Sequence, residues 1–193
     1  MNSQITWFVS RSSGIVAWGL VTVAVVLGLL LSSRALSKVA SPAWTLDLHR
    51  FLGGFSVVFT AIHLIGLWAD SYVEFGWAEL FVPMASLWEP GAVAFGIVAM
   101  YVLVAVELTS LLRRRLPRQV WGWVHHSSLP LYAVATYHAI AAGSDSDLVI
   151  FKIVAYSSVA VVTALTVTLL RVARRRTSSD REPSDGIVRR LPL

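Results

Sequence analysis

Five apolar stretches, each long enough to cross a lipid bilayer, make up most of this chain of 193 residues. A membrane helix needs roughly 17 to 25 mostly apolar residues to span the hydrocarbon core. Stretches of this kind lie near residues 14–31, 48–68, 92–112, 121–142 and 148–172. Backbone groups inside a bilayer must be satisfied within the protein, which a helix does by itself. The sequence therefore predicts an all-α integral membrane bundle of five transmembrane helices.

These helices form one predicted domain over residues 1–172, followed by a polar tail at 173–193 that we expect to be disordered. A signal peptide is an alternative interpretation of the first stretch. Arg34 and Lys38 follow that stretch, however, and no A-x-A cleavage site precedes them. The pattern favours a retained first helix.

The chain has a net charge of +5, and its basic and acidic residues lie in different loops. Basic residues cluster between the first and second stretches, between the third and fourth, and after the fifth: Arg34, Lys38, Arg50, Arg113, Arg114, Arg115, Arg118, Arg171, Arg174, Arg175 and Arg176. The other two loops are mainly acidic, with Asp70, Glu74, Glu79, Glu89, Asp145 and Asp147. Under the positive-inside rule, this places the N-terminus outside and the C-terminus in the cytoplasm. Topology thus accounts for the charge, and we expect a multi-pass protein of the plasma (inner) membrane without a nucleic-acid partner.

The second stretch carries a histidine near each end. His49 and His63 lie 14 residues apart, which on a helix puts them on one face, about 40° apart and about 21 Å apart along the axis. Between them Gly53, Ser56 and Thr60 form a stripe of small or polar side chains on the same face. Such a stripe leaves room for a flat group bound between two ligands, but it also suits close packing of membrane helices.

The fourth stretch carries the remaining three of the five histidines, His125, His126 and His138. It runs parallel to the second stretch, so His49 should lie level with His125 or His126, and His63 with His138. An unpaired imidazole in hydrocarbon is costly, so it needs a partner or a ligand. Two facing pairs, each binding one metal axially, would satisfy this need at two levels about 20 Å apart.

Two imidazoles are too few for a closed tetrahedral zinc site, but they complete the coordination of a haem iron. We therefore predict two haem b groups. The chain has no cysteine, which excludes disulfides, thiolate-bound iron–sulfur clusters and c-type haem attachment. One difficulty concerns the fourth helix, because His125 and His138 would lie about 140° apart on an ideal helix, and His126 and His138 about 120° apart. Either Pro130 kinks the helix or the helix begins after it, and this geometry does not choose between His125 and His126.

Two charged residues at the helix ends have competing interpretations. Glu107 lies inside the third stretch, where an ionisable residue needs a partner. An ion pair with Arg50 or with the arginines at 113–115 is favoured over proton handling. Arg11 is expected to be a snorkelling anchor at the outer surface, and a role in holding an acidic group of a cofactor is the alternative.

Several motifs together resemble the ferric reductase-like transmembrane domain superfamily. They are HRFLGG with His63 beyond it, ELTS followed by RRRLP, W-x-x-x-H with a second histidine 13 residues on, and AGSD. That superfamily includes the membrane cores of NADPH oxidases and eukaryotic ferric reductases. It also includes the bacterial haem-binding membrane subunit of the periplasmic methionine sulfoxide reductase system.

The resemblance implies that electrons pass from an inner to an outer haem. His49 and His125 would bind the inner iron, and His63 and His138 the outer iron. The W-x-x-x-H motif selects Trp121 and His125, which leaves His126 as the runner-up. Arg50 is a candidate partner for a haem propionate, although the positive-inside rule explains it equally well.

One departure from the oxidases concerns the electron donor. The sequence contains no glycine-rich nucleotide-binding fingerprint, so we expect electrons to come from a separate cytoplasmic reductase or from quinol. The outer acceptor stays open between ferric iron, oxygen and a periplasmic partner. The sequence thus predicts an oxidoreductase or its electron-transfer subunit. The alternatives are a divalent metal transporter that uses the histidines as ligands, and a non-catalytic electron-relay subunit.

Overall fold

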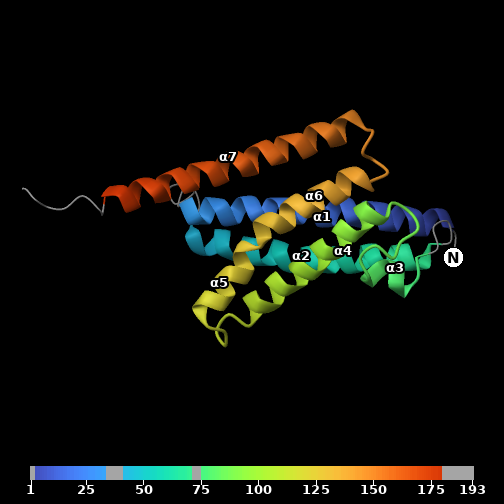
Figure 1. Cartoon of the computed structure of the whole chain (residues 1–193), viewed down its shortest axis with the longest axis horizontal. Coiled ribbons are helices and arrows are strands. Elements are labelled where there is room, and N and C mark those ends of the chain that lie inside the picture. The colour runs from blue at the N-terminus through green and yellow to red at the C-terminus, as the bar shows by residue number, and fades with distance from the viewer. Residues whose placement is uncertain (1–2, 34–40, 71–74, 180–193) are drawn as a thin grey trace, which may run out of the picture.

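The computed structural model describes residues 3–33, 41–70 and 75–179, which form seven helices and no strand (Figure 1). The helices are α1 (Ser3–Ser33), α2 (Pro42–Ala69), α3 (Trp77–Phe81), α4 (Pro90–Leu111), α5 (Arg118–His126), α6 (Ser128–Ala141) and α7 (Val149–Ser179). The predicted all-α class is confirmed for this part of the chain. Four of the helices, α1, α2, α4 and α7, are long and apolar enough to cross a membrane. The protein is therefore a multi-pass membrane protein.

The predicted fourth span is interrupted, because α5 ends at His126 and α6 begins at Ser128. Pro130 explains this position. Proline has no backbone N–H and its ring clashes with the carbonyl four residues earlier, which here belongs to His126. Pro130 itself lies in the first turn of α6, where helices accept proline. The span count of five and the orientation of the termini therefore stay predictions.

The other helix ends differ modestly from those expected. The N-cap Ser41 accepts a hydrogen bond from the Trp44 backbone N–H at 3.3 Å, and Pro42 starts α2. Residues 3–13, which precede the first predicted stretch, are the first part of α1. At the other end, α7 continues to Ser179, beyond the end expected near residue 172. Residues 180–193 of the predicted tail lie outside the described residues.

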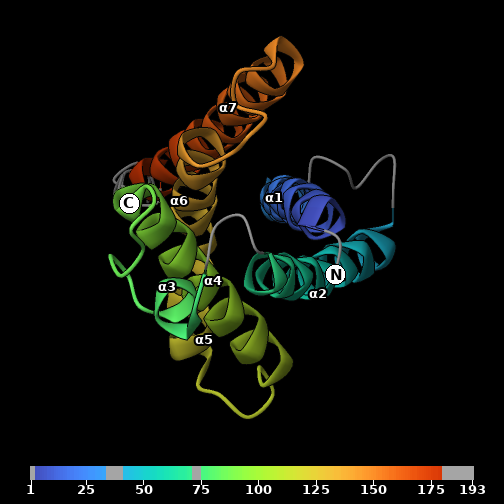
Figure 2. The same cartoon turned by 90° about the vertical axis from the view of Figure 1, so that its right-hand side faces the viewer.

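The helices form two groups that face each other (Figures 1 and 2). The antiparallel pair α1 and α2 forms one group, and α4 packs on α6 in the other. Between them lies an apolar layer of buried residues from α1, α4, α6 and α7: Val21, Val25, Ala99, Leu103, Leu131, Tyr132 and Val162. Trp18 on α1 also donates a hydrogen bond to the Thr136 hydroxyl on α6 at 3.0 Å. This layer occupies the middle of the bundle and separates the two sites described next.

Candidate functional site

Two cavities lie between the helix groups, and each contains one of the predicted histidine pairs. The larger, of about 330 Å³, is lined by His63 and His138 and is called here the His63–His138 cavity. The smaller, of about 120 Å³, is lined by His49 and His125 and is called the His49–His125 cavity. Val21, Leu103 and Leu131 line both cavities, so the apolar layer forms the partition between them. The fold thus brings each pair together at a separate level.

The two rings of the His49–His125 pair are spaced as two ligands of one metal ion would be. Their centroids lie 6.0 Å apart and their planes are inclined by 77°. An imidazole nitrogen binds a metal at about 2 Å, so two histidines on opposite sides of one ion have ring centroids about 6 Å apart. The small cavity is below the roughly 300–1,000 Å³ of most ligand pockets. Binding of a large group there therefore requires the lining side chains to move apart.

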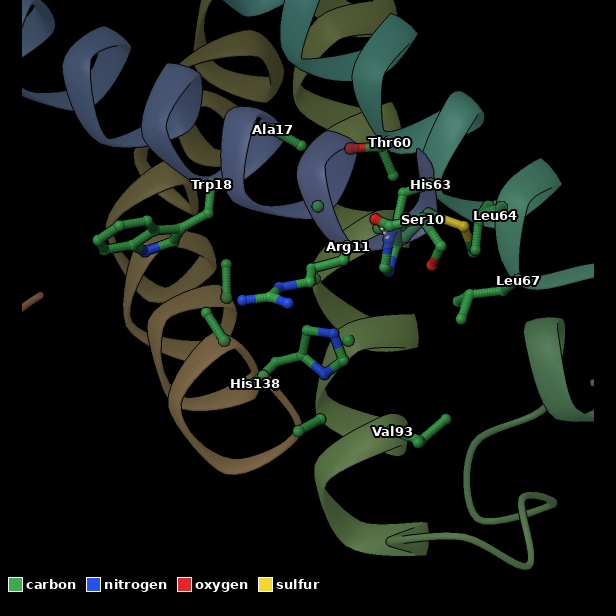
Figure 3. Close-up of a pocket in the computed structure, with 18 of the residues that line it drawn as sticks. Ser10, Arg11, Ala17, Trp18, Thr60, His63, Leu64, Leu67, Val93 and His138 are labelled. Atoms are coloured by element: carbon green, nitrogen blue, oxygen red, sulfur yellow. Dashed lines mark hydrogen bonds between the residues drawn. The ribbon is translucent and has the colours of Figure 1, made fainter. Parts of the chain in front are cut away.

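In the other cavity, His63 reaches in from α2 and His138 from α6 (Figure 3). Thr60 lies one turn before His63 and lines the same space, while Arg11 of α1 extends beside the two rings. Apolar side chains such as Leu64 and Val93 complete the wall shown. This cavity falls within the usual size range for a small-molecule pocket.

Three of the four paired histidines have a defined tautomer. Each Nδ1 lies against a main-chain carbonyl of a neighbouring helix: His49 on Ala24 at 2.9 Å, His63 on Ser10 at 2.8 Å and His138 on Ala92 at 2.8 Å. A carbonyl oxygen only accepts hydrogen bonds, so each Nδ1 must carry the hydrogen. The Nε2 of a neutral ring is then left with a free lone pair, which is the state that binds a metal.

His125 and His126 differ in their surroundings. The His125 ring stacks on Trp121 with centroids 4.9 Å apart, and the Arg113 guanidinium lies over Trp121 at 4.7 Å. Among the residues described, the buried Nδ1 of His125 has no hydrogen-bond partner. His126 is exposed and bonds to the Gly122 carbonyl of its own helix at 2.5 Å. Both line the small cavity, but the ring facing His49 is that of His125, which favours it as the ligand.

The small-residue stripe of α2 is divided between the two cavities. Gly53 and Ser56 line the His49–His125 cavity, and Thr60 lines the other. Both hydroxyls bond back to their own helix, Ser56 to the Gly53 carbonyl at 2.6 Å and Thr60 to the Ser56 carbonyl at 2.7 Å. Their hydrogens are therefore already used. Arg50 is exposed and pairs with Asp47 at 3.5 Å, so its propionate role stays a prediction.

The ion pair expected for Glu107 is not formed. Arg50 pairs with Asp47 and Arg113 stacks on Trp121, and no ion pair to Glu107 occurs within the described ranges. Instead, the half-buried carboxyl lines the His49–His125 cavity opposite Gly53. The sequence places this group inside the third apolar stretch but does not identify its neighbour.

One contact was not predicted at all. Arg11 forms a two-pronged ion pair with the buried Asp145, with Nε 2.5 Å from Oδ2, and its guanidinium also lies over Trp7 at 4.8 Å. This pair ties α1 to the loop between α6 and α7, and both of its residues line the His63–His138 cavity. The two residues are 134 positions apart. The only available sequence signal was that both belong to the same predicted outer side.

Comparison with known proteins supports the resemblance seen in the motifs. Residues 13–136 match the family described as "Ferric reductase like transmembrane component". The matched region includes His49, His63 and His125 and ends two residues before His138. Searches of curated proteins and of solved structures found no match. The match covers well over half of the chain, and on this ground the protein belongs to the family of ferric reductase-like transmembrane components.

Proposed function

We propose that this protein is a transmembrane b-type cytochrome that passes electrons from the cytoplasmic side, through two bis-histidine haems, to an acceptor on the outer face. Its family suggests a membrane electron-transfer role. The observation that carries the finer proposal is the pair of cavities, each lined by imidazoles from two different helices. In three of these imidazoles the Nε2 lone pair is free.

The donor set fits a metal that brings most of its own ligands. Across the described part of the chain, no group of three or more His, Cys, Asp or Glu residues is arranged to hold a bare ion. Catalytic zinc takes at least three protein ligands and structural zinc four. A haem iron already has four porphyrin nitrogens and needs only two axial ligands. Two facing histidines per cavity supply that number.

The residues of the chain would bind, orient and insulate these groups. A bound haem b supplies one-electron chemistry, whereas the protein sets its position and surroundings. His49 and His125 would hold the inner group, and His63 and His138 the outer one. The apolar layer, which includes the buried Val21, Leu103 and Leu131, would insulate the two sites from each other.

Charge supports the proposed direction. The His49–His125 cavity lies toward the end of the bundle that carries the exposed Arg113, Arg114, Arg115 and Arg118, and the other cavity is lined by Asp70, Glu79 and Asp145. Under the positive-inside rule the basic end is cytoplasmic. Electrons would then enter from a separate reductase or quinol and leave toward ferric iron, oxygen or a periplasmic partner, across the plasma (inner) membrane.

The test is a dithionite-reduced minus oxidised visible spectrum of the purified protein, with the haem quantified as pyridine haemochrome. About two haems b per chain are expected in the wild type and about one in His63→Ala, because each iron needs both of its axial ligands. His126→Ala is the matched control and should retain both. A wild-type protein that contains zinc or copper instead of haem would overturn the proposal and favour the metal transporter.

A further inference from the structure

Three glycines lie directly against the three histidines whose carbonyl partner belongs to a neighbouring helix. Each glycine follows that carbonyl by one helical turn: Gly14 follows Ser10, Gly28 follows Ala24, and Gly96 follows Ala92. A helical Cβ leans toward the N-terminus, so the side chain at position i+4 covers the turn that carries the carbonyl of residue i. Without a Cβ at that position, the carbonyl stays open to a ring from the neighbouring helix.

The distances show how closely each glycine approaches its ring. A Cβ added to Gly96 would lie 2.6 Å from His138 Cε1 and 2.7 Å from its Nδ1. A Cβ on Gly14 would lie 2.9 Å from His63 Nδ1, and one on Gly28 would lie 3.3 Å from His49 Cε1. The first two approaches are too close for any side chain to fit without moving the ring. The third is tight, and the ring would need to move only slightly.

The spacing along α1 matches the spacing along α2. Gly14 and Gly28 are separated by 14 residues, as are His49 and His63. Because α1 and α2 are antiparallel (Figure 1), the later glycine faces the earlier histidine and the earlier glycine faces the later one. Helix α1 therefore carries two carbonyl–glycine pairs with the same spacing as the two histidines of α2 that they contact.

We propose that Gly14, Gly28 and Gly96 are positioning residues for the histidine ligands, each opening a main-chain carbonyl that holds an imidazole with Nδ1 protonated and Nε2 free. The inference rests on the proposed function, since it assigns these rings to haem iron. The hydrogen bond fixes the ring orientation and makes the imidazole a stronger ligand.

The two sites then differ in how firmly their ligands are held. Both His63 and His138 have a carbonyl–glycine pair, so the outer site is fixed on both sides. In the other site only His49 has one, because the Nδ1 of His125 finds no partner within the described structure. Of the four proposed ligands, His125 is thus the one whose ring is not held by a hydrogen bond at Nδ1 among the described residues.

The experiment compares glycine-to-alanine variants of the full-length, haem-loaded protein. Gly14→Ala, Gly28→Ala and Gly96→Ala each add one Cβ against a ring. Gly19→Ala in α1 and Gly91→Ala in α4 are matched controls, because a Cβ at either position meets nothing within 4 Å. Alanine favours a helix more than glycine does, so weaker ligation cannot come from helix propensity.

Two spectroscopic readouts follow the ligands. Low-spin ferric electron paramagnetic resonance reports each haem, and ¹⁵N NMR of histidine-labelled protein reports which ring nitrogen carries the hydrogen. Gly14→Ala and Gly96→Ala should alter the same haem signal, and Gly28→Ala the other. The loss of haem affinity should be about 10-fold or more in Gly96→Ala and smallest in Gly28→Ala, in the order of the distances. The affected midpoint potential should rise, because a less basic ligand stabilises the ferric state less.

Unchanged resonance and NMR spectra in all three variants would overturn the inference, as would equal effects in Gly19→Ala and Gly91→Ala. If Gly96→Ala fails to fold, Gly28→Ala still tests the inference, because its steric conflict is the mildest. If the wild type binds no haem, the proposed function fails separately. The NMR readout then still decides the inference: Nδ1–H in His49, His63 and His138 supports it, and Nε2–H contradicts it.

Discussion

Gly53 and Glu107 meet across α2 and α4 so closely that any Cβ at residue 53 would overlap the Glu107 carboxyl. Gly54 provides a matched control, because a Cβ there meets nothing within 4 Å. A double-mutant cycle should therefore give a coupling free energy of about 0.5–3 kcal/mol between Gly53→Ala and Glu107→Ala, as residues in contact do. Thermal or denaturant unfolding in detergent provides the measurement.

The same cycle between Gly54→Ala and Glu107→Ala should be additive within about 0.5 kcal/mol. The sign of the first coupling is also fixed by the structure. Removing the Glu107 side chain makes room for the new methyl group, so the double variant should be more stable than the sum of the single changes. Additivity at Gly53 would show that the carboxyl already lies elsewhere.

At this scale the sequence predicted the histidine pairs but not the contacts of the charged residues near them. The paired histidines follow from residue type and helical spacing, and the structure brings each pair to one cavity. The contacts of Glu107 and Arg11 depend on how separate helices are rotated against each other. These rotations are set by the packing of many apolar side chains. The pattern of apolar residues in a single sequence does not reveal that packing.

The interruption between α5 and α6 determines where His125 can point. A continuous helix over both segments would place His125 and His138 about 140° apart. In α5 no residue is buried, whereas α6 is fixed by the buried Leu131, Tyr132 and Thr136. If the helix were made continuous, His125 would therefore move and His138 would stay.

Pro130→Ala tests this relation, because it restores the backbone N–H and removes the clash with the His126 carbonyl. We expect the haem content to fall from about two to about one per chain, with the loss at the His49–His125 site. Pro90→Ala is the control, since Pro90 begins α4 and interrupts no helix. Retention of both haems in Pro130→Ala would mean that packing, rather than proline, keeps the helix broken.

The sequence indicated that the fourth stretch departs from an ideal helix, but it did not show where. The 13-residue spacing signalled that an ideal helix could not carry both ligands on one face, and Pro130 was the evident cause. The break itself lies at Ser127, three residues earlier. Two of the carbonyl–glycine pairs also had a signal in the sequence. The 14-residue spacing of Gly14 and Gly28 matches the spacing of His49 and His63.

For the whole molecule, hydropathy and charge predicted more than local patterns did. Four apolar stretches form helices that are long and apolar enough to cross a bilayer, in which a helix satisfies its own backbone groups. The fifth, between the α4–α5 loop and the α6–α7 loop, is the one that the structure divides. Whether it crosses determines if these two loops lie on opposite sides of the membrane, and hence if the two cavities face opposite compartments.

The absence of cysteine from the chain makes this question directly testable with single introduced thiols. Arg114, in the α4–α5 loop, and Asp147, in the α6–α7 loop, are both exposed. The positive-inside rule places the arginine-rich loop in the cytoplasm, so a membrane-impermeant maleimide on intact cells should label Asp147→Cys and not Arg114→Cys. Lysis should make both reactive. Labelling of both in intact cells would mean that α5 and α6 do not cross together, and labelling of Arg114→Cys alone would invert the topology and the proposed direction of electron flow.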